Sequence, residues 1–152
     1  MASINTSKMI IAGVAAGVIL FIADGLVNGV LLADQWAAYQ KSIGKPSEFS
    51  GSQMGIFSAI DVGVGLMLAW VYAAIRPRFG AGPATAIRAG IATWALTSLL
   101  PGLFLIASQA MPADLMWISI GIGIIQFAIA GYVAGVLYKE AAEPAAMRRA
   151  SA

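Results

Sequence analysis

Two residue types that supply much of the chemistry of enzyme sites are missing from this chain, which contains no cysteine and no histidine. Without cysteine it has no disulfide, thiolate zinc site, iron–sulfur cluster or thiol nucleophile. Without histidine it lacks the usual haem ligand, the commonest metal ligand and the usual general base. We therefore expect a protein that is not an enzyme and has no cofactor or metal site, with hydrolysis by aspartate alone as the enzyme class left open.

Charged residues are scarce as well. They make up 11% of the 152 residues, against about 25% in a typical soluble domain. Hydrophobic residues make up 60%, and the mean hydropathy is +0.84. This composition predicts an integral membrane protein that forms a single domain over residues 1–152. The net charge is only +2 and the basic residues form no clustered face, so we expect no nucleic-acid partner.

Four long apolar runs predict an all-α fold, a four-helix transmembrane bundle. A helix rises about 1.5 Å per residue, so each run is long enough to cross a hydrocarbon core of about 30 Å. The expected spans cover residues 9–32, 54–75, 89–111 and 115–138. Trp36 and Tyr39 share one helical face, which predicts a short interfacial helix over 34–43 between the first two spans. Residues 139–152 form a polar tail.

Prolines and small polar residues mark the expected helix ends. Pro77, between two arginines, is expected to close the second span. Ser50 or Ser52 is expected to cap the start of that span, and Asp114 the start of the fourth. Pro101 lies near the middle of the third span, where it should kink the helix and free a backbone carbonyl.

Lysine and arginine are distributed unequally between the two sides of the membrane. Seven belong to the N-terminus, the second loop and the tail, and two to the first and third loops. The positive-inside rule therefore places both termini of a multi-pass protein in the cytoplasm. We expect the first run to be retained as a span, because it is long for a signal peptide and Phe21 stands at the −3 position of the best cleavage site.

The polar residues inside the expected spans include a predicted intramembrane cluster of Asp24, Asn28, Asp61 and Gln126. Asp24 and Asp61 are expected about 5 Å to the outer side of the bilayer centre, at one depth and facing each other. No lysine or arginine lies within the expected spans, and two facing carboxylates cannot both easily ionise, so at least one should hold a proton. The group is either a shared proton or cation site, or a set of hydrogen bonds that holds helices or subunits together. We favour the second interpretation.

Small residues form two ridges that let helix backbones approach closely. The residues are Gly13, Gly17, Gly25 and Gly29 in the first span, on one ridge with Phe21, and Gly131 and Gly135 in the fourth. The ridges indicate packing within the chain, or oligomerisation through the first span. Aromatic residues at the ends of the helices are expected to anchor the protein at the membrane interfaces. They are Trp36, Tyr39, Trp70, Trp117 and Tyr138.

The run FIADGLVNGVLLADQWAAY, residues 21–39, resembles small four-span bacterial inner-membrane proteins of unknown function. The resemblance implies a location in the bacterial inner membrane and no known activity.

Taken together, these features predict a non-catalytic accessory or structural subunit that packs within a larger membrane complex. Its expected partners are the lipid bilayer and other membrane subunits, or further copies of itself. The alternative is a small oligomeric transporter or channel for protons or cations that uses Asp24 and Asp61.

Overall fold

The computed structural model describes residues 4–139, and all regular secondary structure within that range is helical. The elements are α1 (Thr6–Leu26), the π-helical turn η1 (Val27–Leu31), α2 (Ala33–Ser42), α3 (Gly51–Phe79), α4 (Pro83–Trp94), the π-helical turn η2 (Ala95–Leu99), α5 (Leu100–Ala107) and α6 (Ala113–Leu137). The tail expected at 139–152 lies outside the described residues, apart from Lys139.

Four continuous helical stretches are long and apolar enough to cross a membrane. They are Thr6–Leu31, Gly51–Phe79, Pro83–Ala107 and Ala113–Leu137. Each overlaps one of the four expected spans, so the chain has the features of a multi-pass membrane protein.

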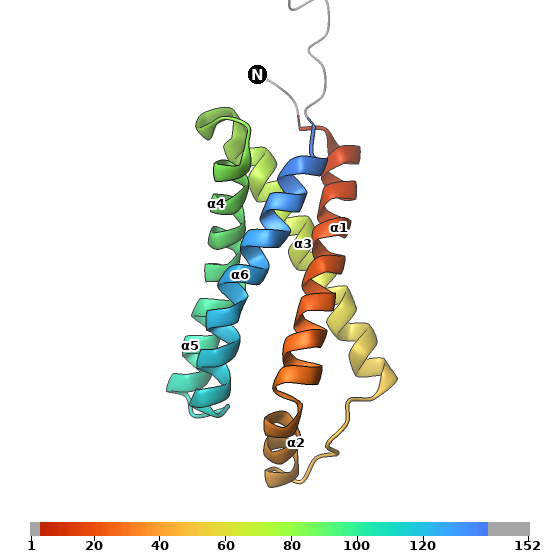
Figure 1. Ribbon diagram of the computed structural model, residues 1–152, viewed down its shortest axis with the longest axis vertical. Helices are drawn as coiled ribbons and strands as arrows, with labels where there is room; N and C mark the ends of the chain where they lie inside the picture. The colour runs from red at the N-terminus through yellow and green to blue at the C-terminus, as the bar shows by residue number, and fades with distance from the viewer. Residues whose placement is uncertain (1–3, 140–152) are drawn as a thin grey trace, which may run out of the picture.

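The four long helices run alternately in opposite directions (Figure 1). α1 packs against α3 and α6, and α4 packs against α6 and α3. The described ends of the chain lie together at one end of the molecule, whereas α2 lies at the other (Figure 1). The first half of α3 diverges from α1, and residues 51–57 of α3 are exposed on all sides. The packed contact between α1 and α3 therefore lies in the half of the molecule nearest the chain ends, whereas the contact of α4 with α6 continues to Trp94, Met116 and Ile120.

Small side chains form most of this core. The alanines at the helix contacts are at most 2% exposed, and they are Ala12, Ala16, Ala69, Ala73, Ala86, Ala89, Ala130 and Ala134. Tyr72, Leu20 and Leu68 are the large apolar side chains that are fully buried among them. Because alanine and glycine keep backbones close, this core relies on dense van der Waals contact.

Helix α3 is longer at both ends than its sequence indicates. Ser50 caps its start in a capping box with Gln53, as expected for one of the two serines. The expected stop at Pro77 is wrong, because the helix continues to Phe79. Pro77 falls in the last turn, where the missing N–H removes a single intrahelical bond. The helix ends at Gly80, whose φ of +82° suits a residue without a side chain.

The turn between α3 and α4 is short, because Pro83 is the first residue of α4 and its fixed φ favours a helix start. The third span therefore begins six residues earlier than expected. Before Pro101 the helix widens into the π-helical turn η2, in agreement with the expected loss of regular backbone bonding there. Thr97 and Thr93 donate their hydroxyl hydrogens to the carbonyls of Thr93 and Ala89.

The start of α6 also differs from expectation. Pro112 occupies the N-cap position, and Asp114 is the second residue of the helix. Asp114 is thus in the first turn, where a carboxylate favours the positive end of the helix dipole without capping a backbone N–H.

Candidate functional site

Asp24 and Gln126 are brought together in the interior of the fold. The side-chain amide of Gln126 on α6 donates a hydrogen bond of 3.1 Å to Oδ1 of Asp24 on α1. Gln126 is only 8% exposed, and Asp24 is half-buried. An amide donor compensates a carboxyl group for the loss of water in an apolar environment.

Asn28 lies one turn further along the same helix. Its amide donates to the backbone carbonyl of Asp24 at 3.2 Å, and its side-chain oxygen accepts a 3.1 Å hydrogen bond from Nε1 of Trp36. Asn28 belongs to η1, where the backbone bonding pattern is π-helical. The Asn28 side chain thus connects the end of α1 to α2. Asp24, Asn28 and Gln126, three of the four polar residues expected to cluster, are neighbours.

Asp61 is placed differently from expectation. The backbone oxygen of Asp61 lies against Gly17, and Asp24 is seven residues, or about 10 Å of helix, beyond Gly17. The expectation that the two acids lie at one depth is therefore wrong, since the contact between α1 and α3 sets a different register. The two carboxyl groups still lie within electrostatic reach of each other. The side chain of Asp61 has no hydrogen-bond partner among residues 4–139.

The first glycine ridge is divided into a packed part and an open part. A Cβ on Gly13 would lie 2.7 Å from the Cα of Leu66, and one on Gly17 would lie 2.5 Å from the Cα of Val62. Gly65 of α3 lies against the backbone of Gly13 and Gly17 from the other side. Only glycine fits at these positions, so this half of the ridge packs α1 onto α3.

Gly25 and Gly29 are in the open part. No described atom lies within 4 Å of the position that a Cβ would take on either residue. Gly29 also belongs to η1, a π-helical turn whose backbone bonds span one residue more than those of an α-helix. These two glycines pack against no other part of residues 4–139, and packing against another chain stays a prediction.

The second ridge packs α6 against α4. A Cβ on Gly131 would lie 2.6 Å from the carbonyl oxygen of Ala86, and one on Gly135 would lie 2.5 Å from the Cβ of Ala86. Gly90 lies against the backbone of Phe127. Gly65 and Gly90 were not predicted as packing residues. Each lies within an apolar run and faces one of the two ridges, Gly65 at Gly13 and Gly17 and Gly90 at Gly131.

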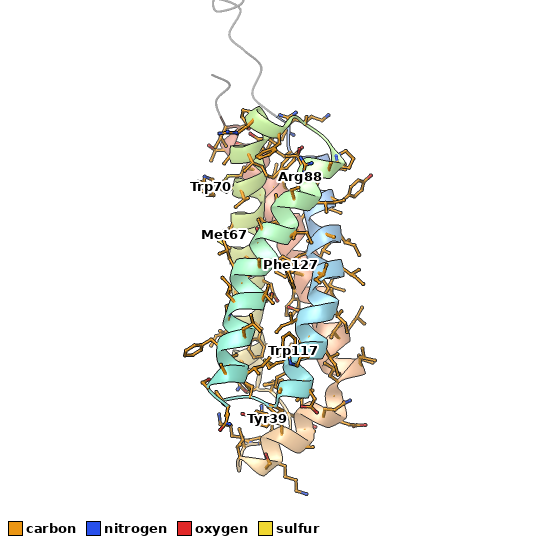
Figure 2. All side chains as sticks on the ribbon, turned by 90° about the vertical axis from the view of Figure 1, so that its left-hand side faces the viewer. Tyr39, Met67, Trp70, Arg88, Trp117 and Phe127 are labelled. Atoms are coloured by element: carbon orange, nitrogen blue, oxygen red, sulfur yellow. The ribbon has the colours of Figure 1, made fainter. Side chains whose placement is uncertain are left out.

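The five expected anchors fall into two groups. Trp70 and Trp117 are 54% and 53% exposed, and they lie toward opposite ends of the molecule, Trp70 toward the end that holds Arg88 and Trp117 toward the end that holds Tyr39 (Figure 2). Tyr138 is instead 3% exposed. Its ring stacks edge-to-face on Tyr72 and lies beneath the guanidinium of Arg76.

Trp36 and Tyr39 both bond to other parts of the chain, so their side chains are structural. Besides the bond of Trp36 to Asn28, the Tyr39 hydroxyl donates to the carbonyl of Ala110 at 2.9 Å. α2 is thereby connected to the turn between α5 and α6. A shallow cavity of about 360 Å³ lies at this junction, with Gln35 and Asp114 in its wall.

No three acidic side chains within residues 4–139 come together in a way that could hold a metal ion. Comparison of the chain with known protein families, with characterised proteins and with solved structures gave no match.

Proposed function

We propose that this chain is a non-catalytic subunit of a larger membrane complex, with its four long helices forming a transmembrane bundle. In this proposal both termini lie in the cytoplasm and α2 lies in the outer membrane interface. Charge distribution supports the orientation. Lys8, Arg76, Arg78, Arg88 and Lys139 belong to the end at which α1 starts and α6 finishes, and Lys41 and Lys45 belong to the other. The resemblance of residues 21–39 supports a bacterial inner membrane.

The observation that carries the proposal is the unfilled side of the molecule around the first half of α3. Five helical glycines of α1, η1 and the first half of α3 have no described atom within 4 Å of a Cβ position: Gly25, Gly29, Gly51, Gly55 and Gly63. Glycine in a helix costs about 1 kcal/mol relative to alanine. In membrane helices this cost is offset where a second backbone approaches closely. Since no backbone within residues 4–139 makes such an approach, we assign it to another subunit.

The test is the mass of the particle that contains this chain when it is extracted from its native membranes in mild detergent, measured by light scattering. We expect a particle larger than one chain with its detergent. Replacing Gly25→Leu and Gly29→Leu together should reduce it to the single chain. Gly121→Leu is the matched control, because Gly121 also has no described atom near its Cβ position but lies on α6. A monomeric wild-type particle would contradict the proposal.

A second candidate function is movement of protons or cations, and the electrostatic coupling of Asp24 and Asp61 favours it. Two acidic groups within one membrane-spanning region mark ion pathways in many membrane proteins. Purified protein in liposomes should then carry a proton or sodium flux that disappears in the Asp24→Asn, Asp61→Asn double variant. Absence of flux in the wild-type protein excludes this function and leaves the subunit proposal unaffected.

A further inference from the structure

The guanidinium of Arg88 lies over the ring of Phe79, with 5.6 Å between its carbon atom and the ring centroid. Both side chains are exposed, at the end of the molecule opposite Tyr39 (Figure 2). Stacking occupies one face of the planar group, and the N–H donors in its plane stay free to bind. None of residues 4–139 forms a hydrogen bond or an ion pair with Arg88. The fold thus presents an ordered guanidinium whose donors have no partner among the described residues.

The turn between α3 and α4, which carries this pair, is held by two hydrogen bonds. The hydroxyl of the buried Thr85 donates to the carbonyl of Phe79 at 3.2 Å. The backbone N–H of Gly82 donates to the hydroxyl oxygen of the buried Tyr72 at 3.4 Å. Because these bonds join the end of α3 to the start of α4, Phe79 and Arg88 keep their relative position. A ligand that binds there therefore loses little free energy in ordering the site.

Within residues 4–139, this end of the molecule carries positive charge and no acidic side chain. The described acidic residues all lie in the half that holds α2, and they are Asp24, Asp34, Glu48, Asp61 and Asp114. Asp61, in the same helix as Phe79, is about 27 Å of helix away from it. Arg78 and Lys8, both exposed, add their charges to the same end. No described acid can therefore pair with Arg88, and its free donors suit an anionic ligand.

The level of Arg88 along its helix indicates the source of that anion. The stretch Pro83–Ala107 has 25 residues, so it is about 37 Å long, against about 30 Å for a hydrocarbon core. Arg88 is the sixth residue of α4, about 8 Å from its start and close to the boundary of that core. At this level an arginine extends its charged group to the interface, where phospholipid phosphates lie. Phe79 and Ile87, which are 54% and 40% exposed, supply apolar surface for an acyl chain.

We infer that Arg88, stacked on Phe79, binds the phosphate group of an anionic phospholipid in the leaflet at this end of the molecule. The inference rests on the transmembrane arrangement in the proposed function. The guanidinium holds the phosphate through two parallel N–H···O bonds. The positive charge of this end attracts the net charge of an anionic headgroup, whereas a zwitterionic headgroup carries none. Anionic lipid is therefore selected over phosphatidylcholine at this position.

Fluorescence quenching at one position tests the inference. Because the chain has no cysteine, Ala84→Cys, exposed and one turn before Arg88 on α4, takes a single fluorophore. The full chain is reconstituted in phosphatidylcholine vesicles that contain phosphatidylglycerol or phosphatidylcholine with a nitroxide on the acyl chain. The labelled phosphatidylglycerol should quench at an about fivefold lower mole fraction than the labelled phosphatidylcholine. At Ala113→Cys, in the first turn of α6 at the other end, the two lipids should quench alike.

Variants of the chain show whether Arg88 is the cause. Arg88→Ala should remove the preference for phosphatidylglycerol. Arg88→Lys keeps the charge without the stacked planar group, and should lower the preference by about twofold, as should Phe79→Leu. Lys8→Ala is the matched control, because it removes an exposed cation at the same end but on α1, and should leave the preference unchanged. Circular dichroism confirms that each variant is helical.

Several outcomes would overturn the inference. Equal quenching by the two lipids at Ala84→Cys would mean that this position does not select anionic lipid. A loss in Lys8→Ala as large as that in Arg88→Ala would make the total charge the cause, and an undiminished preference in Arg88→Lys would exclude the stacked geometry. Release of the lipid by inorganic phosphate, at an ionic strength matched with chloride, would make a free anion the ligand, and release by a polyglutamate peptide would make the partner an acidic protein. The proposed function fails separately, through a monomeric particle in the light-scattering measurement.

Discussion

The side-chain amide of Gln126 reaches across from α6 to hydrogen-bond the carboxyl group of Asp24 on α1, at 3.1 Å and over 102 positions of sequence. Its neighbour Asp61 has no such bond within residues 4–139. The two aspartates, both in membrane-crossing helices, thus differ in that residues 4–139 supply a hydrogen-bond donor to Asp24 and none to Asp61. The hydrogen bond gives Asp24 a structural role in joining α1 to α6, which Asp61 does not share.

The bond between Gln126 and Asp24 should contribute measurably to stability. Gln126→Leu removes the donor and should lower the free energy of unfolding by about 0.6–1.7 kcal/mol, the average and the maximum for hydrogen bonds between membrane helices. Asp24→Leu and the double variant complete a thermodynamic cycle, in which we expect a positive coupling energy. Unfolding by titration with dodecyl sulfate in mixed micelles measures all four proteins. Simple additivity of the two substitutions would show that the bond contributes nothing.

Gly17 and Gly25 lie on one ridge of α1 but should respond in opposite ways to alanine. Gly17→Ala places a Cβ 2.5 Å from the Cα of Val62, so the helices must move apart at a cost of about 1–3 kcal/mol. Gly25→Ala meets no described atom and should leave the isolated chain equally stable, or more stable by up to about 1 kcal/mol. The same unfolding titration makes the comparison. Equal losses at both positions would contradict the register of α1 on α3.

Trp36 should hold α2 to the end of α1. Trp36→Phe removes the indole donor to Asn28, and a bond of this kind contributes about 1 kcal/mol. Local opening of α2 should then become about fivefold more frequent. Hydrogen exchange of the backbone amides in residues 36–42, followed by mass spectrometry, measures the change. Trp70→Phe is the control, since Trp70 is exposed and forms no such bond, and exchange that is equally fast in both variants would refute the link.

Tyr138, the C-cap of α6, should contribute more to stability than Tyr132, an exposed tyrosine within that helix. Tyr138→Leu removes the edge-to-face contact with Tyr72 and the position of the ring beneath Arg76. We expect a loss of about 1–3 kcal/mol in the free energy of unfolding. Tyr132→Leu, at a side chain that is 48% exposed, should change it by less than about 0.5 kcal/mol. A loss of similar size in both variants would show that the stacked arrangement is not stabilising.

Composition and apolar run length are enough to predict the helical class and the four long helices, because membrane-crossing segments must satisfy their own backbone bonds. Helix ends are harder to predict. The pattern around Pro77 predicts a stop, yet a proline in the last turn costs only one bond, and Pro83 favours a helix start that extends the next helix backwards. A proline in the sequence therefore does not by itself show whether it lies in the last turn of one helix, as Pro77 does, or at the start of the next, as Pro83 does.

Part of the candidate site could also be predicted from the sequence. Asp24, Asn28 and Gln126 are neighbours as expected, because polar side chains inside apolar helices form hydrogen bonds with one another. The position of Asp61 was not predictable from the midpoints of the expected spans, since the contact of Gly65 with Gly13 and Gly17 sets the register of α3. The role of Trp36 was also missed, because interfacial aromatics and hydrogen-bonded aromatics have the same sequence pattern.

The backbone N–H of Asn5 lies 3.3 Å from the hydroxyl oxygen of Tyr138, which brings the start of α1 beside the end of α6. A short linker could therefore join these two points, and the exposed 43–50 loop could be opened instead. Such a circular permutant would retain the helix contacts described above, yet both of its new ends would emerge on the face where α2 lies. Reporter tags could then be displayed on either side of one and the same fold.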